Sequence, residues 1–424
     1  MVANCLGDAS RRVPADVLRR TGDALDRWSE LVRPLPRSLA FATRTLRRPT
    51  VDPLTERVAT RREGFTLLAG AFLDEMLTGV FRAVHPPRPE AEVSRSLDDA
   101  LLAVERFERH GWFDSPARLH RPPPPPDDAT LSPASAGRTR YEHLTFTSGY
   151  APHRDDPGRA RWLGYEANAT AHAWVLRHDD TRPWIVCVHG ALMGRPRLDL
   201  SAFRARWLHD RLALNVAVVV LPLHGPRSAR RFPGQDFPVT VDPLDTLHGV
   251  SQAVWDVRRV LAWIRARTDA PIGLQGLSLG GHTAAITAGL EPDLACVIAG
   301  IPVVDLSELF GGHLPERALY HDEYVRLMTA SHRILGLVSP LNFPPLVPAD
   351  RRFIYGGIGD RLVHPRRQVQ RLAAHWEWPS TAWYPGGHTG AFASAPIGRF
   401  VHSALAHSGL VSTEPATSSA GLAP

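Results

Sequence analysis

The stretch of sequence that decides the fold spans residues 271–282 and reads PIGLQGLSLGGH. An apolar run of strand length leads into Gly-x-Ser-x-Gly, and a helix-like run of small residues follows. This order predicts a sharp strand-to-helix turn with Ser278 at its apex, although an ordinary capping serine in a glycine-rich turn would read similarly. Gly276 and Gly280 would stand where strand and helix pack too closely for side chains. The turn would also direct the Leu279 amide toward the space above the Ser278 hydroxyl.

The composition is that of a globular protein, with 424 residues of which 44% are hydrophobic and 22% charged. This length suits one large domain and an extra segment. All 49 basic residues are arginine, and the formal net charge is +6. The arginines are scattered among carboxylates without a recognition motif, so the sequence predicts no nucleic-acid partner.

The cysteines and the N-terminus indicate the compartment. Three cysteines are too few for a disulfide framework, and no metal-ligand spacing joins them. Cys187 and Cys296 lie in strand-like runs and are expected to be buried and reduced. The first residues lack an apolar signal-peptide core, and the longest hydrophobic region contains Asp74 and Glu75, so it predicts a helix and not a membrane span. A cytoplasmic protein is expected.

Residues 1–121 predict a helical N-terminal extension, beginning with a helix from Pro14 through Trp28. Two further helices are indicated by apolar positions spaced three or four apart: Phe65, Leu68, Phe72, Met76, Val80 and Val84 in one, and Leu97, Leu101, Val104 and Phe107 in the other. The extension would pack on the main domain, cover the active site as a lid, or dock on lipid. A proline run then predicts a stiff linker over residues 122–140.

Residues 141–410 predict an α/β domain, because strand-like apolar runs alternate with helical patterns. An insertion at about 306–349 interrupts the alternation at the edge of the sheet where ligands bind, and is interpreted as a substrate-shaping cap. Its apolar residues favour a hydrophobic acyl chain: Leu309, Phe310, Leu314, Tyr320, Tyr324 and Leu327. Residues 411–424 predict a disordered tail.

A serine nucleophile needs a base and a group that orients the base. His388 follows the last predicted strand in a glycine-rich loop, where an imidazole can reach the turn at Ser278. Asp360 follows the preceding strand and would fix the imidazole tautomer. Asp305, after an earlier strand, is the competing acid.

The loop after the strand at 184–188 begins with His189-Gly190. We expect it to cross close to Ser278 and to offer the Ala191 amide, or that of Leu192, as a second oxyanion donor beside Leu279. His189 itself is interpreted as bracing this loop.

Two further histidines have competing interpretations. His224 and Arg227 follow the next strand, where they would meet a substrate carboxylate or phosphate, or serve only as structural loop residues. His224 and Leu192 are the predicted substrate-binding residues. His282, on the helix after Ser278, is expected to pack or cap.

Taken together, these motifs resemble those of the α/β-hydrolase superfamily over about residues 141–408. The resemblance rests on residues 276–280, His189-Gly190, Asp360 and His388. It implies a mostly parallel eight-stranded sheet with helices on both faces, a Ser278–His388–Asp360 triad and an acyl-enzyme intermediate. It does not extend to residues 1–121.

The sequence therefore predicts a serine hydrolase that cleaves a small-molecule or lipid carboxylic ester and needs no cofactor and no metal. Esterase and lipase activity stay open, as do peripheral membrane contact and the oligomeric state. The alternatives are a peptidase or acyl-peptide hydrolase of the same fold, and a non-catalytic binding protein.

Overall fold

The computed structural model describes residue 37 and residues 61–84, 90–228, 242–313 and 322–412. The helix predicted from Pro14 through Trp28 and nearly all of the predicted tail lie outside the described residues.

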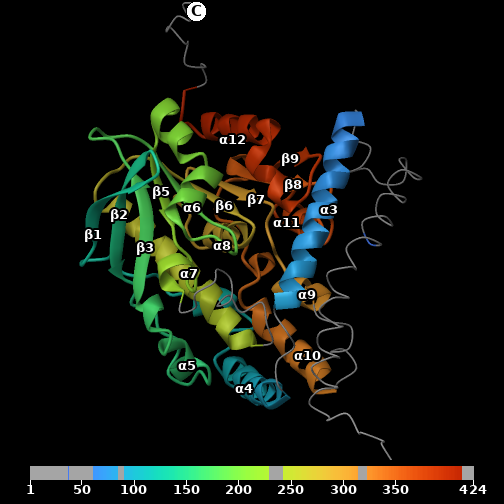
Figure 1. Cartoon of the computed structure of the whole chain (residues 1–424). Helices are drawn as coiled ribbons and strands as arrows, with labels where there is room; N and C mark the ends of the chain where they lie inside the picture. Colours follow the sequence, from blue (N-terminus) through green and yellow to red (C-terminus); the bar gives the residue numbers. More distant parts are fainter. Residues whose placement is uncertain (1–36, 38–60, 85–89, 229–241, 314–321, 413–424) are drawn as a thin grey trace, which may run out of the picture.

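The centre of the fold is one nine-stranded sheet in the order β1-β2-β3-β5-β4-β6-β7-β8-β9 (Figure 1). The strands from β5 through β9 in this order pair in parallel, whereas β1, β2, β3 and β5 pair antiparallel. The strands are β1 Thr130–Ala136, β2 Thr139–Thr147, β3 Thr170–Leu176, β4 Trp184–Val188, β5 Asn215–Val219, β6 Ile272–Leu277, β7 Cys296–Gly300, β8 Arg352–Gly357 and β9 Ser380–Tyr384. All residues of β4 to β8 are buried, which explains their continuous apolar sequences. Cys187 and Cys296 are buried free thiols within this sheet, as predicted.

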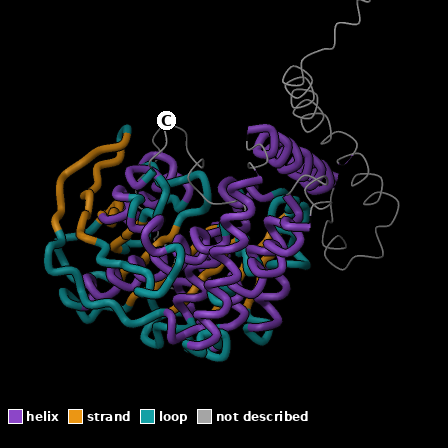
Figure 2. The backbone as a smooth tube through the Cα atoms, turned by 90° about the horizontal axis from the view of Figure 1, so that it is seen from below, coloured by secondary structure: helices purple, strands orange, loops and turns teal. Residues whose placement is uncertain are grey.

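The prediction of eight strands and a linker over 122–140 is wrong at β1. This strand pairs with β2 through a hairpin whose turn holds Gly137 at a φ of +63° (Figure 2). It forms the edge of the sheet, and none of its residues is buried. Because an exposed edge strand needs no apolar face, and Pro133 is tolerated at an edge, its sequence reads as a linker.

Helices cover both faces of the sheet, as predicted (Figures 1 and 2). One core cluster joins the sheet to α4, α7, α8, α10 and α11, and the other joins it to α6 and α12. The helices are α3 Arg61–Val84, α4 Glu90–Arg109, α5 Arg159–Leu163, α6 Pro196–Ala202, α7 Pro243–Arg265, α8 Leu279–Ala288, α9 Leu306–His313, α10 Asp322–Gly336, α11 Val369–His375 and α12 Ala395–His407. This mostly parallel sheet, with helices on both faces and a tight β6–α8 turn, is the α/β-hydrolase fold. Among the described residues, no helix has the length and apolar character needed to cross a membrane.

The two described helices of the N-terminal extension differ in how they pack. In α4, Leu97 and Phe107 are buried in the core cluster that also holds α7 and α8. In α3 the predicted apolar face is not the buried one, because Phe65 is 75% and Phe72 40% exposed. The buried side of α3 instead carries Leu67, Ala71, Asp74, Glu75 and Thr78. Small and polar residues lie there because α3 packs against loop backbone rather than against a hydrophobic core.

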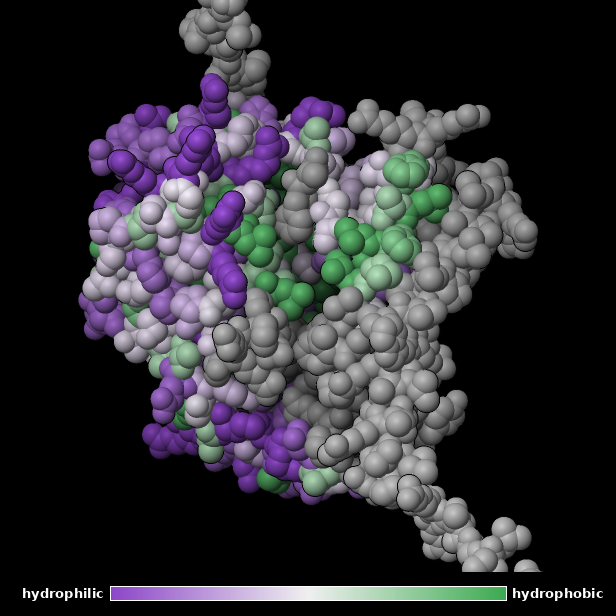
Figure 3. Space-filling model, viewed as in Figure 1, coloured by the Kyte–Doolittle hydropathy of each residue, from purple (hydrophilic) through white to green (hydrophobic). Residues whose placement is uncertain are grey.

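The exposed side of α3 is apolar, with Phe65, Phe72, Leu73 and Leu77 all partly accessible. Figure 3 shows apolar side chains gathered over α3 and across a hollow from it. The lid and lipid-docking roles of the extension stay predictions.

The insertion after β7 contains α9 and α10. Three of its predicted substrate-shaping residues, Phe310, Tyr324 and Leu327, are buried within the main core, so they stabilise the fold. Leu309 packs against the same core, and Leu314 and Tyr320 lie outside the described residues.

Candidate active site

Ser278 stands at the turn between β6 and α8 with φ of 55° and ψ of −112°. A non-glycine residue at positive φ is strained, and such strain gathers at functional sites. A Cβ atom on Gly276 would lie 2.0 Å from the carbonyl oxygen of Gly280, and one on Gly280 would lie 1.9 Å from that of Val188. The turn therefore requires both glycines, which confirms the predicted geometry of the strand-to-helix turn.

The structure brings Ser278, His388 and Asp360 together at the carboxyl ends of three strands. The Nε2 atom of His388 lies 3.0 Å from Oγ of Ser278. On the other side of the ring, Nδ1 lies 2.7 Å from Oδ2 of Asp360. The second oxygen of Asp360 accepts hydrogen bonds from the amides of Leu362 at 3.0 Å and Val363 at 2.7 Å. Because Nδ1–H donates its hydrogen bond to the buried carboxylate, Nε2 carries no proton and can accept the hydrogen bond of the serine hydroxyl.

The charge around His388 favours its protonated form. Burial lowers the pKa of this imidazole, but attraction and hydrogen bonding to Asp360, with a further contribution from Asp74, raise it above its usual value. The ring is thus a stronger proton acceptor than an exposed histidine.

The competing acid Asp305 does not reach His388. Its Oδ1 accepts hydrogen bonds from Oγ of Ser307 at 2.7 Å and from the amide of Glu308 at 3.0 Å, where it caps α9. Its Oδ2 lies 3.2 Å from Arg371. The structure therefore brings Asp360, and not Asp305, to the imidazole.

The loop after β4 passes directly over the turn. An ideal Cβ atom on Gly190, the residue before Ala191, would lie 3.4 Å from Cβ of Ser278. Leu192, the next residue, is 49% exposed at a φ of 65°. The oxyanion role of Ala191 and Leu279 and the substrate contact of Leu192 stay predictions.

His189 is buried beneath this loop. Its Nδ1 donates to the carbonyl of Gly190 at 2.7 Å, and its Nε2 accepts from the amide of Leu221 at 3.1 Å. Burial lowers its pKa to about 4. A neutral ring with both nitrogens bonded to backbone braces the loop, as the sequence predicts.

His224 and Arg227 both lie below the surface. The Nδ1 atom of His224 lies 2.8 Å from the carbonyl oxygen of Pro222, and burial lowers the pKa of its ring to about 3. Its substrate-binding role stays a prediction. The fully buried Arg227 pairs with Asp256 at 2.8 Å, so the geometry favours its structural interpretation.

His282 is buried on α8, with its Nδ1 atom 3.0 Å from the carbonyl oxygen of Val303. This contact confirms that it packs within the fold.

The sequence did not predict Asp74 at this site. This fully buried residue of α3 accepts two backbone hydrogen bonds with its Oδ2 atom, one from His388 at 2.7 Å and one from Arg361 at 2.9 Å. These amides belong to the two loops that carry the imidazole and Asp360. The one available signal was an acid in the middle of an apolar helix, where a charge is costly unless it has partners.

Two close backbone contacts fix α3 against the same loops. A Cβ atom on Gly70 would lie 2.2 Å from the amide nitrogen of Gly387, and one on Gly359 would lie 3.0 Å from the carbonyl oxygen of Leu67. Beside them, Glu75 pairs with Arg361 at 3.0 Å. The extension therefore packs directly against the loops that carry His388 and Asp360.

The buried carboxyl of Asp74 has an unusual charge environment. Burial, followed by repulsion from Asp360, raises its pKa from 3.8 to about 7. Its Oδ1 atom is buried with no hydrogen-bond partner among the described residues. The group thus titrates near neutrality beside the imidazole.

No model of a known protein family matches the sequence. Two uncharacterized proteins of Mycobacterium tuberculosis, Rv2627c and MT2702, are each 44% identical to it over 357 residues, covering 84% of this chain and 86% of theirs. The chain belongs to their family. Because both relatives are uncharacterized, membership of their family does not indicate an activity for this chain.

Several solved structures show lower similarity. Acetyl xylan esterase 1 from Thermoanaerobacterium is 15% identical with a TM-score of 0.41, covering 77% of this chain and 95% of that one. An acetyl xylan esterase from Paenibacillus is 15% identical with a TM-score of 0.44, covering 69% and 93%. A puromycin-hydrolyzing peptidase of M. tuberculosis is 16% identical with a TM-score of 0.38, covering 58% and 38%. Sequence identities and TM-scores this low do not identify a substrate for this chain.

Proposed function

We propose that this protein is a serine hydrolase that cleaves carboxylic esters through an acyl-enzyme. The observation that carries the proposal is the continuous hydrogen-bonded chain from Asp360 through His388 to Ser278, with the serine at a strained turn. A serine held this way has a base within reach and an acid that fixes the base.

In the first half of the reaction, Oγ of Ser278 attacks the ester carbonyl carbon while its proton passes to Nε2 of His388. The tetrahedral intermediate then collapses. The bond to the leaving alkoxide breaks, and His388 returns the proton to that oxygen as the alcohol departs. Asp360 stabilises the imidazolium that exists between these two transfers.

In the second half, water attacks the acyl group on Ser278. His388 takes a proton from this water and gives it back to Oγ as the carboxylic acid leaves. The amides of Leu279 and Ala191 stabilise the oxyanion in both halves. Loss of one such donor costs about 3 kcal/mol in the transition state.

Asp74 acts in this proposal as a positioning residue. By accepting the amides of His388 and Arg361, it holds the imidazole loop and the acid loop in one arrangement. The N-terminal extension then contributes to activity through the backbone that it fixes, without touching substrate.

The test is hydrolysis of p-nitrophenyl esters of graded chain length by the full chain, beside matched p-nitroanilides. We expect ester turnover that is lost in Ser278→Ala and His388→Ala. Turnover of anilides with no turnover of any ester would replace the esterase proposal by the peptidase alternative. Turnover unchanged in Ser278→Ala would remove this serine from the mechanism.

A further inference from the structure

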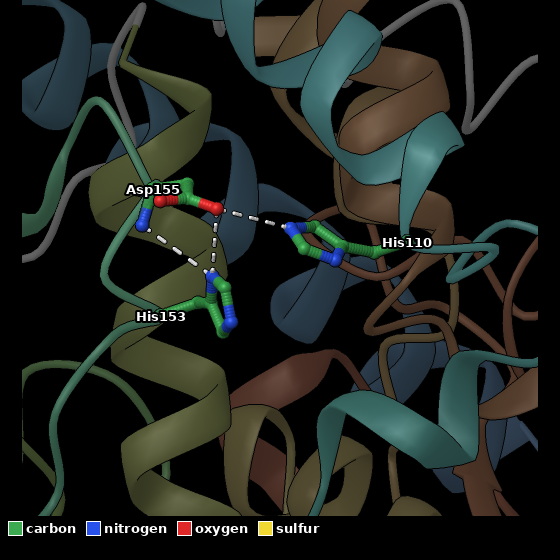
Figure 4. A group of neighbouring side chains, drawn as sticks. All are labelled: His110, His153 and Asp155. Atoms are coloured by element: carbon green, nitrogen blue, oxygen red, sulfur yellow. Dashed lines mark hydrogen bonds and ion pairs between the residues drawn. The ribbon is translucent and has the colours of Figure 1, made fainter.

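Three side chains of metal-ligating types meet outside the elements that hold the candidate active site. His110 follows the C-terminal end of α4, whereas His153 and Asp155 lie in the loop between β2 and α5 (Figure 4). One ligand atom of each residue lies within 4.8 Å of the other two. Oδ2 of Asp155 lies 3.5 Å from Nε2 of His110 and 3.8 Å from Nδ1 of His153.

These separations are close to those of a coordinated ion. With bonds of about 2.0–2.1 Å to nitrogen and oxygen, two ligands of a tetrahedral zinc ion lie about 3.3–3.4 Å apart. The two distances to Asp155 exceed this by only a few tenths of an ångström. The two imidazole nitrogens lie within 4.8 Å of each other. Turning the two rings toward each other and toward Asp155 would bring all three atoms to one ion.

Contacts around the cluster hold the rings in place. The ring of His110 stacks on Trp112 with centroids 4.8 Å apart, and His153 meets the ring of His110 edge-on at 4.5 Å. Arg106 donates a hydrogen bond to the backbone carbonyl of Asp155. The amide of Asp155 makes only a long hydrogen bond of 3.4 Å to Nδ1 of His153, which a metal ion would replace. The three side chains are therefore held near one another before an ion binds.

We propose that His110, His153 and Asp155 bind Zn²⁺ or a similar divalent transition-metal ion, with water at the remaining position. Two imidazoles and one carboxylate suit zinc, whereas Mg²⁺ and Ca²⁺ prefer oxygen ligands. Since the side chain of Asp155 is 61% exposed, the bound ion is accessible from solvent and exchanges with free ions in solution. Its effect is to connect the end of α4 to the loop before α5.

The test is titration of Zn²⁺ into the full chain, prepared without an affinity tag and stripped with chelator. The protein carries Cys5→Ser, because this cysteine lies outside the described residues and a thiol is itself a zinc ligand. Calorimetry should give one ion per chain with micromolar affinity. Co²⁺ should produce the visible absorption bands of a tetrahedral site. Because the ion binds the folded state, Zn²⁺ should raise Tm by about 2–5 °C.

The variants His110→Gln, His153→Gln and Asp155→Asn should each weaken binding at least about tenfold. His407→Gln is the matched control, because this exposed histidine also lies beside a carboxylate, 3.8 Å from Asp350. Circular dichroism establishes that each variant is folded. Absence of binding in the parent protein, or equal affinity in the double variant His110→Gln/His153→Gln, would overturn the proposal and leave an ion-pair cluster.

Discussion

The backbone amide of His388 donates a 2.7 Å hydrogen bond to Oδ2 of Asp74, although the two residues lie 314 positions apart in the chain. The same oxygen accepts a hydrogen bond from the backbone amide of Arg361, the residue that follows Asp360. One buried carboxylate from the N-terminal extension therefore connects the loop of the proposed base to the loop of the proposed acid.

Replacing Asp74 by alanine should lower kcat more than it raises KM. The change leaves two buried amides without an acceptor, which costs about 1–3 kcal/mol each in stability and releases both loops. We expect ester turnover to fall by about tenfold or more. Asp74→Asn keeps an acceptor oxygen and should retain most of the turnover. Equal loss in the two variants would contradict the positioning role.

The raised pKa of Asp74 predicts a pH-dependent stability. In the unfolded chain the carboxyl loses its proton near pH 3.8, whereas in the folded chain it keeps the proton to about pH 7. Between these values the folded state binds more protons, so stability falls as the pH rises, by at most about 1.4 kcal/mol per pH unit. Urea unfolding at several pH values measures this slope. Asp74→Asn, which removes the titration, should make it shallower; an unchanged slope would be inconsistent with the raised pKa.

Two glycines of α3 provide a matched pair. A Cβ atom on Gly70 would collide with the backbone of Gly387, whereas one on Gly64 would meet nothing within 4 Å. Gly70→Ala should therefore displace α3, costing about 2 kcal/mol and lowering ester turnover. Gly64→Ala should leave turnover unchanged and, as a helix substitution, stabilise slightly. Turnover retained in Gly70→Ala would mean that the contact of α3 with the loops is not needed.

The assignment of the acid predicts contrasting effects for two aspartates. Asp360→Asn should leave the imidazole in the wrong tautomer and lower kcat by about ten-thousand-fold. Asp305→Asn keeps an oxygen that can cap α9 and loses only the ion pair with the exposed Arg371. It should therefore change stability by less than about 1 kcal/mol, with little change in kcat. Both are measured by ester kinetics beside thermal unfolding. A larger loss of kcat in Asp305→Asn than in Asp360→Asn would assign the role of the acid to Asp305.

The β6–α8 turn was predictable because its information is local. Gly276, Ser278 and Gly280 lie within five positions, and each has a steric or conformational reason visible in the sequence. Asp360 was predictable because it follows the buried strand β8, and His388 because it follows the last strand-like run, now β9, in a glycine-rich loop. The carboxyl ends of parallel strands meet at one edge of the sheet, which brings the two residues together.

Asp74, β1 and the buried face of α3 could not be predicted in the same way. The partners of Asp74 are backbone amides, which have no sequence signature. The edge strand β1 buries no side chain, so it has no apolar pattern. The buried side of α3 lies close to the backbone of glycine-containing loops, so mainly small and polar residues fit there. The larger residues Phe65 and Phe72 lie on the exposed side. Hydrophobic periodicity therefore indicated the wrong face.

The central claim is that Oγ of Ser278 is activated by His388. The most direct measurement is labelling of the full chain with a fluorophosphonate, read by intact mass and peptide mapping. The account predicts one adduct per chain on Ser278, absent in Ser278→Ala and greatly slowed in folded His388→Ala. A folded wild-type protein that forms no adduct, or forms it equally fast without the imidazole, would contradict the account.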